Sequence, residues 1–358
     1  MRVVVAGAGV AGLALAHALI KHGHEPEVYE AAPELRTTGG AVGLWPGTVA
    51  ILHELGLRPG GVRLTRMSSW TVRGRKQAVI DLTHAERRYG FPSVHVERRE
   101  LVERLAEGIP VTFGARVSEV DPAGAEVHFA GGGSARGDVL VGADGRNSVV
   151  RQALWGADPA RYVGWATWQG FITWPTRPEV LMVVGEQGSL GLTPAGPERQ
   201  LWWFDVRTGP GRPLWEDEPD PIGRLKELFG DWGGVAAKVL ERIEEAGFFP
   251  HLYHPVRKVW GAGPATLAGD AAHTMPPTMA QGANQAVEDA WALSRAVGGD
   301  LRAYERERAR IVARSARMAA TGRTDKPTPV AGLVPDGAMT RFFTWWLRQA
   351  SSYLLTPR

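Results

Sequence analysis

The first thirty residues contain a glycine pattern that few folds can accommodate. Residues 2–6 show no polar alternation, which is typical of a parallel strand buried on both faces. Three glycines follow at once within residues 7–12, in the spacing G-x-G-x-x-G. Residues 13–21 predict a helix, and residues 25–29 predict a second strand that ends at Glu30. This order indicates an α/β domain built around a parallel sheet.

The spacing of the glycines predicts a nucleotide-binding turn. Gly7 permits a tight turn, Gly9 lets the backbone approach a pyrophosphate, and Gly12 allows close packing of the helix on the strand. Glu30 lies eighteen residues beyond Gly12, where a carboxylate can bind the ribose hydroxyls of an adenosine. An ordinary glycine-rich turn is the alternative, but the strand, helix and acid in register favour a nucleotide site.

A second informative stretch lies far along the chain, at residues 266–295. It predicts a short buried strand, a loop centred on Asp270, a stop at the prolines of 276–277, and a long helix opened by Gly282. The first N–H groups of a helix are unpaired and carry the positive end of its dipole. We therefore expect negative charge to bind in front of Gly282.

Composition narrows the class of protein. The 358 residues suffice for two domains, and the net charge of +3, with arginines and acids mixed, does not favour nucleic acid as a partner. The absence of cysteine excludes disulfides, thiol catalysis and thiolate zinc sites, and we expect no metal site. No membrane span is expected, since the apolar residues 3–20 are interrupted by glycines. They read as strand and helix of a cytoplasmic protein rather than a secretory signal.

The middle of the chain differs in character from its ends. Residues 160–258 are rich in tryptophan and alternate as an antiparallel sheet. Trp202 and Trp203 must face opposite sides of one strand, so we weigh core packing against a flat aromatic pocket. The division we predict is a discontinuous domain of residues 1–69, 94–158 and 259–325, a second domain of residues 70–93 and 159–258, and a helical segment of residues 326–358.

Other segments carry weaker signals. Residues 36–57 predict a glycine-rich loop that leads into an amphipathic helix, and Arg98 falls where a strand passes into a helix. Residues 110–142 predict a β-meander. Asp144 follows the last strand of that region, and Ser148 or Asn147 can cap the next helix.

Three of these stretches together resemble the class A flavoprotein monooxygenases, the para-hydroxybenzoate hydroxylase-like family. They are residues 7–12 with Glu30, residues 142–151, and residues 269–284; residues 98–101 are similar to a fourth element of the family. The resemblance covers residues 1 to about 310 and is specific in these motifs, whereas residues 160–258 match only in general pattern.

The resemblance implies an α/β fold with a Rossmann-type FAD-binding domain, an interleaved antiparallel-sheet substrate domain and a C-terminal helical segment. It also implies FAD bound without a covalent link, with NADPH or NADH and O2 as co-substrates. The cofactor-binding residues that it implies are Gly7, Gly9, Val10, Ala11, Gly12, Glu30, Arg98, Val117, Asp144, Asp270, Gly282, Ala283 and Asn284.

The activity implied is hydroxylation of a small, planar, largely uncharged aromatic or polycyclic compound through a flavin hydroperoxide. Gln169, Trp202 and Trp203 are the candidates for the substrate pocket, and we nominate no catalytic base. We expect His273 to be structural. A flavin-dependent oxidase or reductase of the same fold, or a non-catalytic binding protein for a planar ligand, are the alternatives, and the oligomeric state stays open.

Three positions depart from the family pattern, which often has Gly, Arg and Asn where this chain has Ala280, Gln169 and Gly47. We expect Ala280 to be tolerated only with a negative φ, because a Cβ atom disfavours the left-handed region. Gln169 removes a positive charge from the sheet that faces the flavin, which argues against an acidic substrate.

Overall fold

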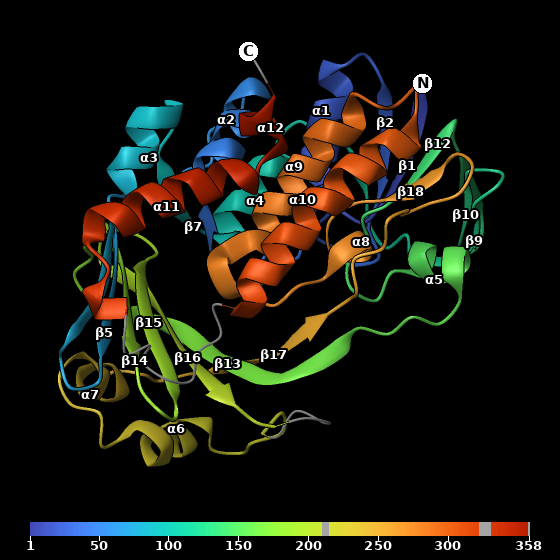
Figure 1. Cartoon of the computed structure of the whole chain (residues 1–358). Coiled ribbons are helices and arrows are strands. Elements are labelled where there is room, and N and C mark those ends of the chain that lie inside the picture. Colours follow the sequence, from blue (N-terminus) through green and yellow to red (C-terminus); the bar gives the residue numbers. More distant parts are fainter. Residues whose placement is uncertain (210–214, 322–330, 357–358) are drawn as a thin grey trace.

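The computed structural model describes residues 1–209, 215–321 and 331–356. A five-stranded sheet forms the centre of one half of the molecule (Figure 1). In spatial order its strands are β18 (Ala265–Leu267), β12 (Val139–Gly142), β1 (Arg2–Ala6), β2 (Glu25–Tyr29) and β8 (Val111–Thr112). All neighbouring strands pair in parallel. This confirms the Rossmann-type sheet, and β1 and β2 have the predicted bounds.

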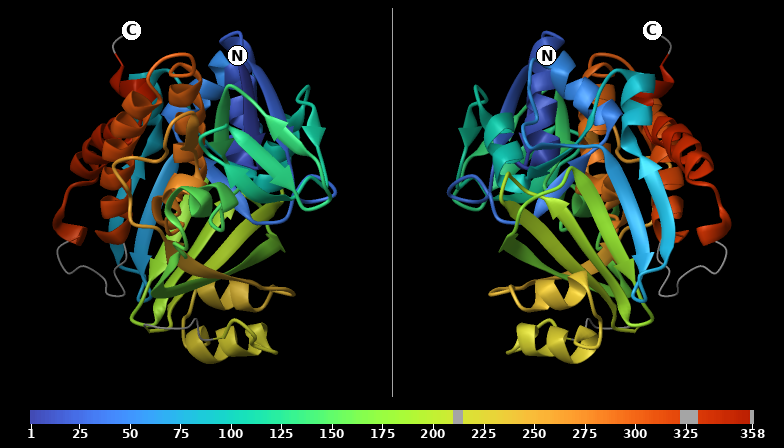
Figure 2. Two further views of the ribbon diagram at one scale, coloured as in Figure 1. Left: turned by 90° about the vertical axis from the view of Figure 1, so that its right-hand side faces the viewer. Right: turned by 90° about the vertical axis from the view of Figure 1, so that its left-hand side faces the viewer.

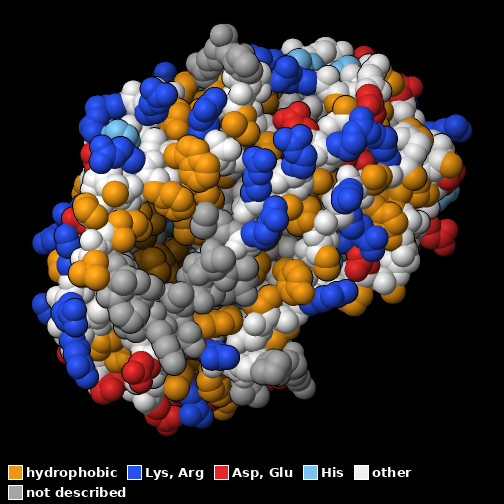
Figure 3. All heavy atoms as spheres, in the orientation of Figure 1, with side chains coloured by type: hydrophobic (Ala, Val, Ile, Leu, Met, Phe, Trp, Pro, Cys, Tyr) orange, Lys and Arg blue, Asp and Glu red, His pale blue; other side chains and the backbone are white. Residues whose placement is uncertain are grey.

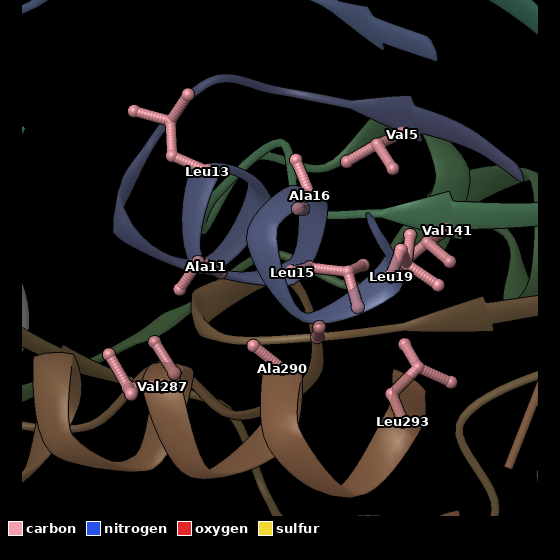
Figure 4. Packing of buried hydrophobic residues seen from close by; sticks show 14 of the residues in the cluster. Val5, Ala11, Leu13, Leu15, Ala16, Leu19, Val141, Val287, Ala290 and Leu293 are labelled. Carbon is pink, nitrogen blue, oxygen red and sulfur yellow. The ribbon is translucent and has the colours of Figure 1, made fainter. Parts of the chain in front are cut away.

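The helix that follows the glycine turn is held against the helix that follows the Asp270 loop. Helix α1 (Val10–Lys21) packs on α9 (Gln281–Ser294). Figure 4 shows Ala11 of α1 pointing toward Val287 of α9, while Ala290 lies below Leu15. All four side chains are buried. Helix α4 (Arg98–Ala106) contacts α1, and both α10 (Leu301–Thr321) and a 3-10 turn η1 (Thr278–Ala280) contact α9. The short α8 (Asp270–His273) packs on α5 (Val149–Trp155).

Two small sheets flank this core. One is the predicted meander, with strands β9 (Val117–Asp121), β10 (Glu126–Phe129) and β11 (Ser134–Arg136). The other contains β3 (Ala41–Leu44), β7 (Ser93–Glu97) and β4 (Val62–Leu64). The prediction for residues 36–57 was partly wrong, because β3 lies inside the expected loop. Helix α2 (Pro46–Glu54) is buried from Pro46 to Leu52 rather than amphipathic, because it contacts α9, α3 (Leu82–Tyr89) and α12 (Ser352–Leu355).

A seven-stranded sheet forms the other half of the molecule. In spatial order its strands are β17 (Gly247–Tyr253), β13 (Arg161–Thr173), β16 (Arg199–Arg207), β15 (Gly188–Pro194), β14 (Glu179–Val184), β5 (Arg66–Thr71) and β6 (Lys76–Asp81). The sheet is antiparallel except where β5 pairs in parallel with β14. Strands β15 and β17 were not predicted. Strand β6 lies in the segment 70–93 and reaches the strands of residues 161–253 through β5, so the sheet contains strands from both segments assigned to the second domain. The predicted boundary at residues 69–70 falls inside β5.

The two faces of this sheet have different surroundings. On one face Trp168, Trp202 and Phe204 form a core with Phe229 of α6 (Pro221–Phe229) and Val239 of α7 (Val235–Leu240). Side chains of the alternate positions lie on the opposite face. Figure 2 shows α6 and α7 on one side of this sheet and the half of the molecule with the five-stranded sheet on the other. Trp202 is completely buried in the core. Its assignment to the substrate pocket is therefore corrected, and Trp203 is the ring on the pocket side.

Helices near the C-terminus cover the remaining edge of the sheet. Helix α11 (Asp336–Gln349) packs on β6 and on α3 (Leu82–Tyr89), and α12 (Ser352–Leu355) reaches α2. A 3-10 turn, η2 (Ala331–Leu333), precedes α11. Figure 3 shows a hollow with apolar walls below α11, over β14–β16. In the part of the chain that the structure describes, no helix is long and apolar enough to cross a membrane. The predicted boundary at residues 325–326 lies outside the described residues.

Candidate active site

The three signature stretches meet at the carboxyl end of β1. A Cβ atom on Gly7 would stand 2.4 Å from the carbonyl oxygen of Ala143, and one on Gly12 would stand 1.9 Å from that of Gly7. A Cβ atom on Gly269 would stand 2.7 Å from the Cβ of Ala11. Only glycine fits at these contacts. The first turn, the segment before Asp144 and the loop of Asp270 therefore line one recess.

Two helices point open N-termini into this recess. Neither α1, which follows Gly9, nor α9 has a side-chain cap on its first turn. A Cβ atom added at Gly9 or Gly282 would meet no non-neighbouring atom of the described residues within 4 Å. Free N–H groups beside open space suit a pyrophosphate at α1 and the electron-rich pyrimidine edge of a flavin at α9. Val10, Ala11 and Ala283 lie in these first turns.

Glu30 is held at the end of β2 by backbone groups. Its carboxylate accepts hydrogen bonds from the N–H groups of Ala8, at 3.0 Å, and Ala32, at 2.8 Å. Its carbonyl oxygen accepts from the N–H of Ala115 at 2.9 Å. The chain just before Val117 is thereby held beside Glu30. This arrangement fits binding of the adenosine by residues 30–32 and 114–117.

Arg98 and Asp270 lie close enough for their charges to interact. Arg98 begins α4, and its Nη1 donates to the carbonyl oxygens of Arg36, at 2.8 Å, and Thr38, at 3.0 Å. Burial lowers the pKa of Arg98, and the negative charge of Asp270 opposes that shift. Asp270 is exposed to solvent, yet the enclosing protein raises its pKa, against the nearby positive charges.

Asp144 contains a buried polar atom without a partner. Its Oδ2 accepts from the N–H of Val149 at 2.7 Å. Its Oδ1 is buried and has no hydrogen-bond partner among residues 1–209, 215–321 and 331–356. Burial raises the pKa of Asp144. Ser148 caps α5, as predicted, by accepting from the N–H of Arg151 at 2.9 Å. The unpaired oxygen fits a site completed by a bound cofactor.

The start of α9 is held by the side chain of Asn284. Its Oδ1 accepts from the N–H of Trp45 at 2.9 Å, and its Nδ2 donates to the carbonyl oxygens of Gly43, at 2.7 Å, and Ala280, at 2.5 Å. The side chain of Asn284 thus positions the loop, and backbone groups remain for a flavin.

The expectation for Ala280 was wrong. Ala280 has φ +51° and ψ +40°, and the preceding Met279 has φ +66°. Both residues are in the left-handed region, which costs a residue with a Cβ atom roughly 1–2 kcal/mol. Tertiary contacts overcome this cost: the bonds of Asn284 hold the loop from one side. The Ala280 side chain also packs against the apolar cluster that contains Trp45 and Phe343.

A buried ionic network supports the Asp270 loop from behind. Asp289 on α9 accepts from the N–H of Gly269 at 2.9 Å, from Nε2 of His273 at 2.6 Å, and from Nε of Arg308 at 2.7 Å. The side chains of His273, Asp289 and Arg308 are fully buried. Although burial opposes ionisation, the positive neighbours lower the pKa of Asp289. His273 therefore stands behind the recess, as expected for a structural residue.

The half of the molecule with the five-stranded sheet touches the seven-stranded sheet at Gln169. A Cβ atom on Gly40 would stand 2.7 Å from Nε2 of Gln169. Trp203 pairs with Gln169 across β13 and β16, and its half-buried ring lies over Gly191. A flat ring and a neutral amide therefore share the face toward the recess. Within the described residues, no group of three or more His, Asp and Glu side chains could hold a metal ion.

His95 was missed by the sequence analysis, because one histidine in a strand carries no distinguishing signal. Its Nδ1 is 2.9 Å from the carbonyl oxygen of Pro194. Burial lowers the pKa of His95 to about 4. The residue links β7 to β15 of the seven-stranded sheet.

Known proteins share both sequence and fold with this chain. Residues 1–319 match the model of the family described as FAD binding domain. The 3-amino-4-hydroxybenzoate 2-monooxygenase PtmB3 of Streptomyces platensis is 33% identical over 320 residues, which cover 83% of this chain and 79% of the relative. The FAD-dependent urate hydroxylase of Klebsiella pneumoniae is 31% identical over 337 residues, 86% of each chain.

A solved structure extends this similarity to the cofactor. The crystal structure of Klebsiella pneumoniae HpxO complexed with FAD and uric acid matches with a TM-score of 0.82 and 27% identity, over 99% of this chain and 94% of that one. Glycine contacts, open helix ends and an unpaired carboxylate oxygen fit the same cofactor here. The chain therefore belongs to the FAD-binding domain family, as an FAD-dependent monooxygenase of the aromatic hydroxylase type.

Proposed function

We propose that this enzyme hydroxylates a planar, largely uncharged aromatic or polycyclic molecule, with O2 and NADPH or NADH as co-substrates. The observation that carries the proposal is the pairing of Gln169 with Trp203 on the sheet face that meets the Gly40 loop. A tryptophan ring offers stacking area, and a neutral amide offers hydrogen bonds without charge. Both favour a flat, uncharged ligand over an acidic one.

The relatives support an aromatic substrate. One acts by name on 3-amino-4-hydroxybenzoate and another on urate. The present chain has Gln169 on its pocket face, so we propose a substrate without a carboxylate at this point. Natural-product tailoring, catabolism and drug inactivation all use such reactions. We also propose a cytoplasmic location, since NAD(P)H is held inside the cell.

The residues of the recess have separate tasks in this proposal. Gly9 and Glu30 bind the pyrophosphate and the adenosine ribose, Arg98 lies along the phosphate side, and Asp270 binds the ribityl chain or the pyrophosphate. The N–H groups at the start of α9 stabilise negative charge that develops at the pyrimidine edge on reduction. Bound FAD supplies the redox chemistry between the nicotinamide, O2 and the substrate.

The division of the chain follows from these tasks. We propose that residues 1–69, 94–158 and 259–325 form the FAD-binding domain and that residues 70–93 and 159–258 form the substrate domain. Residues 326–358 are then a C-terminal helical segment.

The test is oxygen transfer. One oxygen atom of O2 enters the substrate, the other leaves as water, and NAD(P)H supplies two electrons. A panel of planar aromatic compounds is incubated with the FAD-bound enzyme, NAD(P)H and 18O2, and the products are analysed by mass spectrometry. The proposal predicts that at least one compound accelerates NAD(P)H oxidation and gains one 18O atom. If every NAD(P)H consumed yields hydrogen peroxide and no compound is oxygenated, the chain is an oxidase or reductase instead.

A further inference from the structure

His95 presents one ring nitrogen to the pocket side of the molecule. On β7, Val94 and Val96 face the core, so the alternate residue His95 faces the seven-stranded sheet. Its Nδ1 lies 2.9 Å from the carbonyl oxygen of Pro194 at the end of β15. The ring is thereby held between the two halves of the molecule.

This contact determines the tautomer of His95. A carbonyl oxygen can only accept a hydrogen bond, so Nδ1 must carry the proton. In a neutral imidazole the other nitrogen, Nε2, is then an acceptor. The pKa of about 4 keeps the ring neutral at physiological pH.

The acceptor has no protein partner. Among the residues that the structure describes, none forms a hydrogen bond with Nε2 of His95, and Nε2 is not one of the unpaired atoms that the protein encloses completely. The atom therefore reaches accessible space. Its neighbour in the ring, Cδ2, lies 3.6 Å from where a Cβ of Gly43 would stand, and the Ala280 methyl lies 3.3 Å from the same point.

The side of the His95 ring that carries Cδ2 and Nε2 lies near the residues assigned to the cofactor. Ala280 directly precedes α9, whose open N-terminus is assigned to the flavin, and Gly43 is tied to the same loop through Asn284. Because position 43 has no side chain, the space beside Nε2 stays open. A ligand stacked near the flavin and the sheet can therefore reach this nitrogen.

We propose that His95 is a substrate-binding residue whose Nε2 accepts a hydrogen bond from a hydroxyl or N–H group on the aromatic ring of the substrate. This rests on the proposed function and adds to it a residue that selects substrates by a hydrogen-bond donor on the ring. With Gln169, His95 makes a pocket that recognises hydrogen-bond donors without using charge.

The experiment compares ligands that differ only in the donor. Wild-type holoenzyme is titrated with 2-naphthol and 6-hydroxyquinoline, and with their methyl ethers. Binding is followed by tryptophan fluorescence and by the spectrum of bound FAD. A site built to pair with a donor rejects the analogue that lacks it, and one neutral hydrogen bond corresponds to about a tenfold difference in Kd.

Three variants isolate the contribution of His95. His95→Phe keeps a flat ring without nitrogen, and His95→Leu serves the same purpose if the first variant does not fold. His95→Gln restores an acceptor. His128→Leu changes a histidine with a 47% exposed side chain on the distant β10 and serves as the matched control.

We expect wild type and His128→Leu to prefer at least one free donor to its ether by about tenfold. The apolar His95 variants should lose the preference through weaker donor binding, and His95→Gln should regain part of it. The proposal is overturned if wild type shows no preference for any donor, or if the preference survives in the apolar variants. It is also overturned if these variants lose FAD affinity instead. Tryptophan fluorescence reports binding without catalysis, so failure to oxygenate any compound would be a separate result.

Discussion

Gly47 and Ser351 share one space: a Cβ atom on Gly47 would stand 2.3 Å from the Oγ of Ser351. The Ser351 hydroxyl donates to Oε1 of Glu288 on α9 and accepts from the N–H of Leu354 at 3.1 Å. This explains one departure from the family pattern. Where an asparagine is common at position 47, this chain has a glycine and packs its C-terminal segment against both α2 and α9.

Gly47→Ala should weaken this docking. The added methyl overlaps Ser351 and Glu288, and overpacking of this kind costs about 1–3 kcal/mol. Chemical denaturation should show the loss, and Gly47→Ala combined with Ser351→Gly should lose less than the sum of the two single changes. Gly337→Ala is the control, because a Cβ at Gly337 meets no described atom within 4 Å outside its own helix and chain neighbours. If Gly47→Ala and Gly337→Ala change the free energy of unfolding equally, the predicted overlap with Ser351 is wrong.

Ala280→Gly should stabilise the protein, contrary to the usual effect of glycine. A φ of +51° strains alanine but not glycine, so the gain should be about 1 kcal/mol. Ala292→Gly, in the interior of α9, should instead cost about 1 kcal/mol. Thermal unfolding of the FAD-free protein measures both. A loss of stability in both variants would show that Ala280 is not strained.

His95 should make stability depend on pH. Its pKa is about 4 in the folded chain against 6.5 for the ordinary value. The unfolded chain therefore binds the extra proton first as the pH falls. The contribution of the neutral His95 ring to the free energy of unfolding is therefore fully present above pH 6.5. It is lost progressively as the pH falls through about 4.

The control for this pH dependence is His95→Gln, because a glutamine side chain does not titrate. Between pH 6.5 and 4 the free energy of unfolding should fall by about 3 kcal/mol more in wild type than in this variant. Urea unfolding at several pH values measures the difference. If the free energy of unfolding depends on pH in the same way in both proteins, His95 is not buried as a neutral ring.

Asp289→Asn should destabilise the chain strongly. The change leaves Arg308 buried without its carboxylate, and breaking such a pair costs about 3–5 kcal/mol. Glu103→Gln is the control, because its exposed pair with Arg99 contributes less than about 1 kcal/mol. Denaturant unfolding that ranks the two changes equally would contradict the structural role of the network.

Local signals in the sequence were sufficient for one part of the fold and not for another. The segment from β1 to β2 was predictable because its glycines, strand and acid lie within thirty residues. Strands β3, β15 and β17 were missed because they are short and are stabilised by neighbours distant in sequence. The alternation of Trp202 and Trp203 was correct, but which ring enters the core depends on α6 and α7.

The site, like the fold, was predictable only where local sequence determines it. Residues whose role follows from backbone shape, such as Gly7, Gly12 and Glu30, stand where their spacing indicates. Ala280 and His95 could not be predicted, because each is determined by contacts across the fold. A positive φ at Ala280 requires the bonds of Asn284, and the tautomer of His95 requires the carbonyl group of Pro194.

The most direct test of the central claim is titration of the purified, FAD-depleted protein with FAD. The first turn and the Asp270 loop should bind opposite parts of one molecule, so we predict saturable binding of one FAD per chain with quenched flavin fluorescence. Glu30→Ala and Asp270→Ala should each weaken binding while leaving the far-UV circular dichroism unchanged. A folded wild-type protein that binds no FAD, or variants with unaltered affinity, would contradict the account.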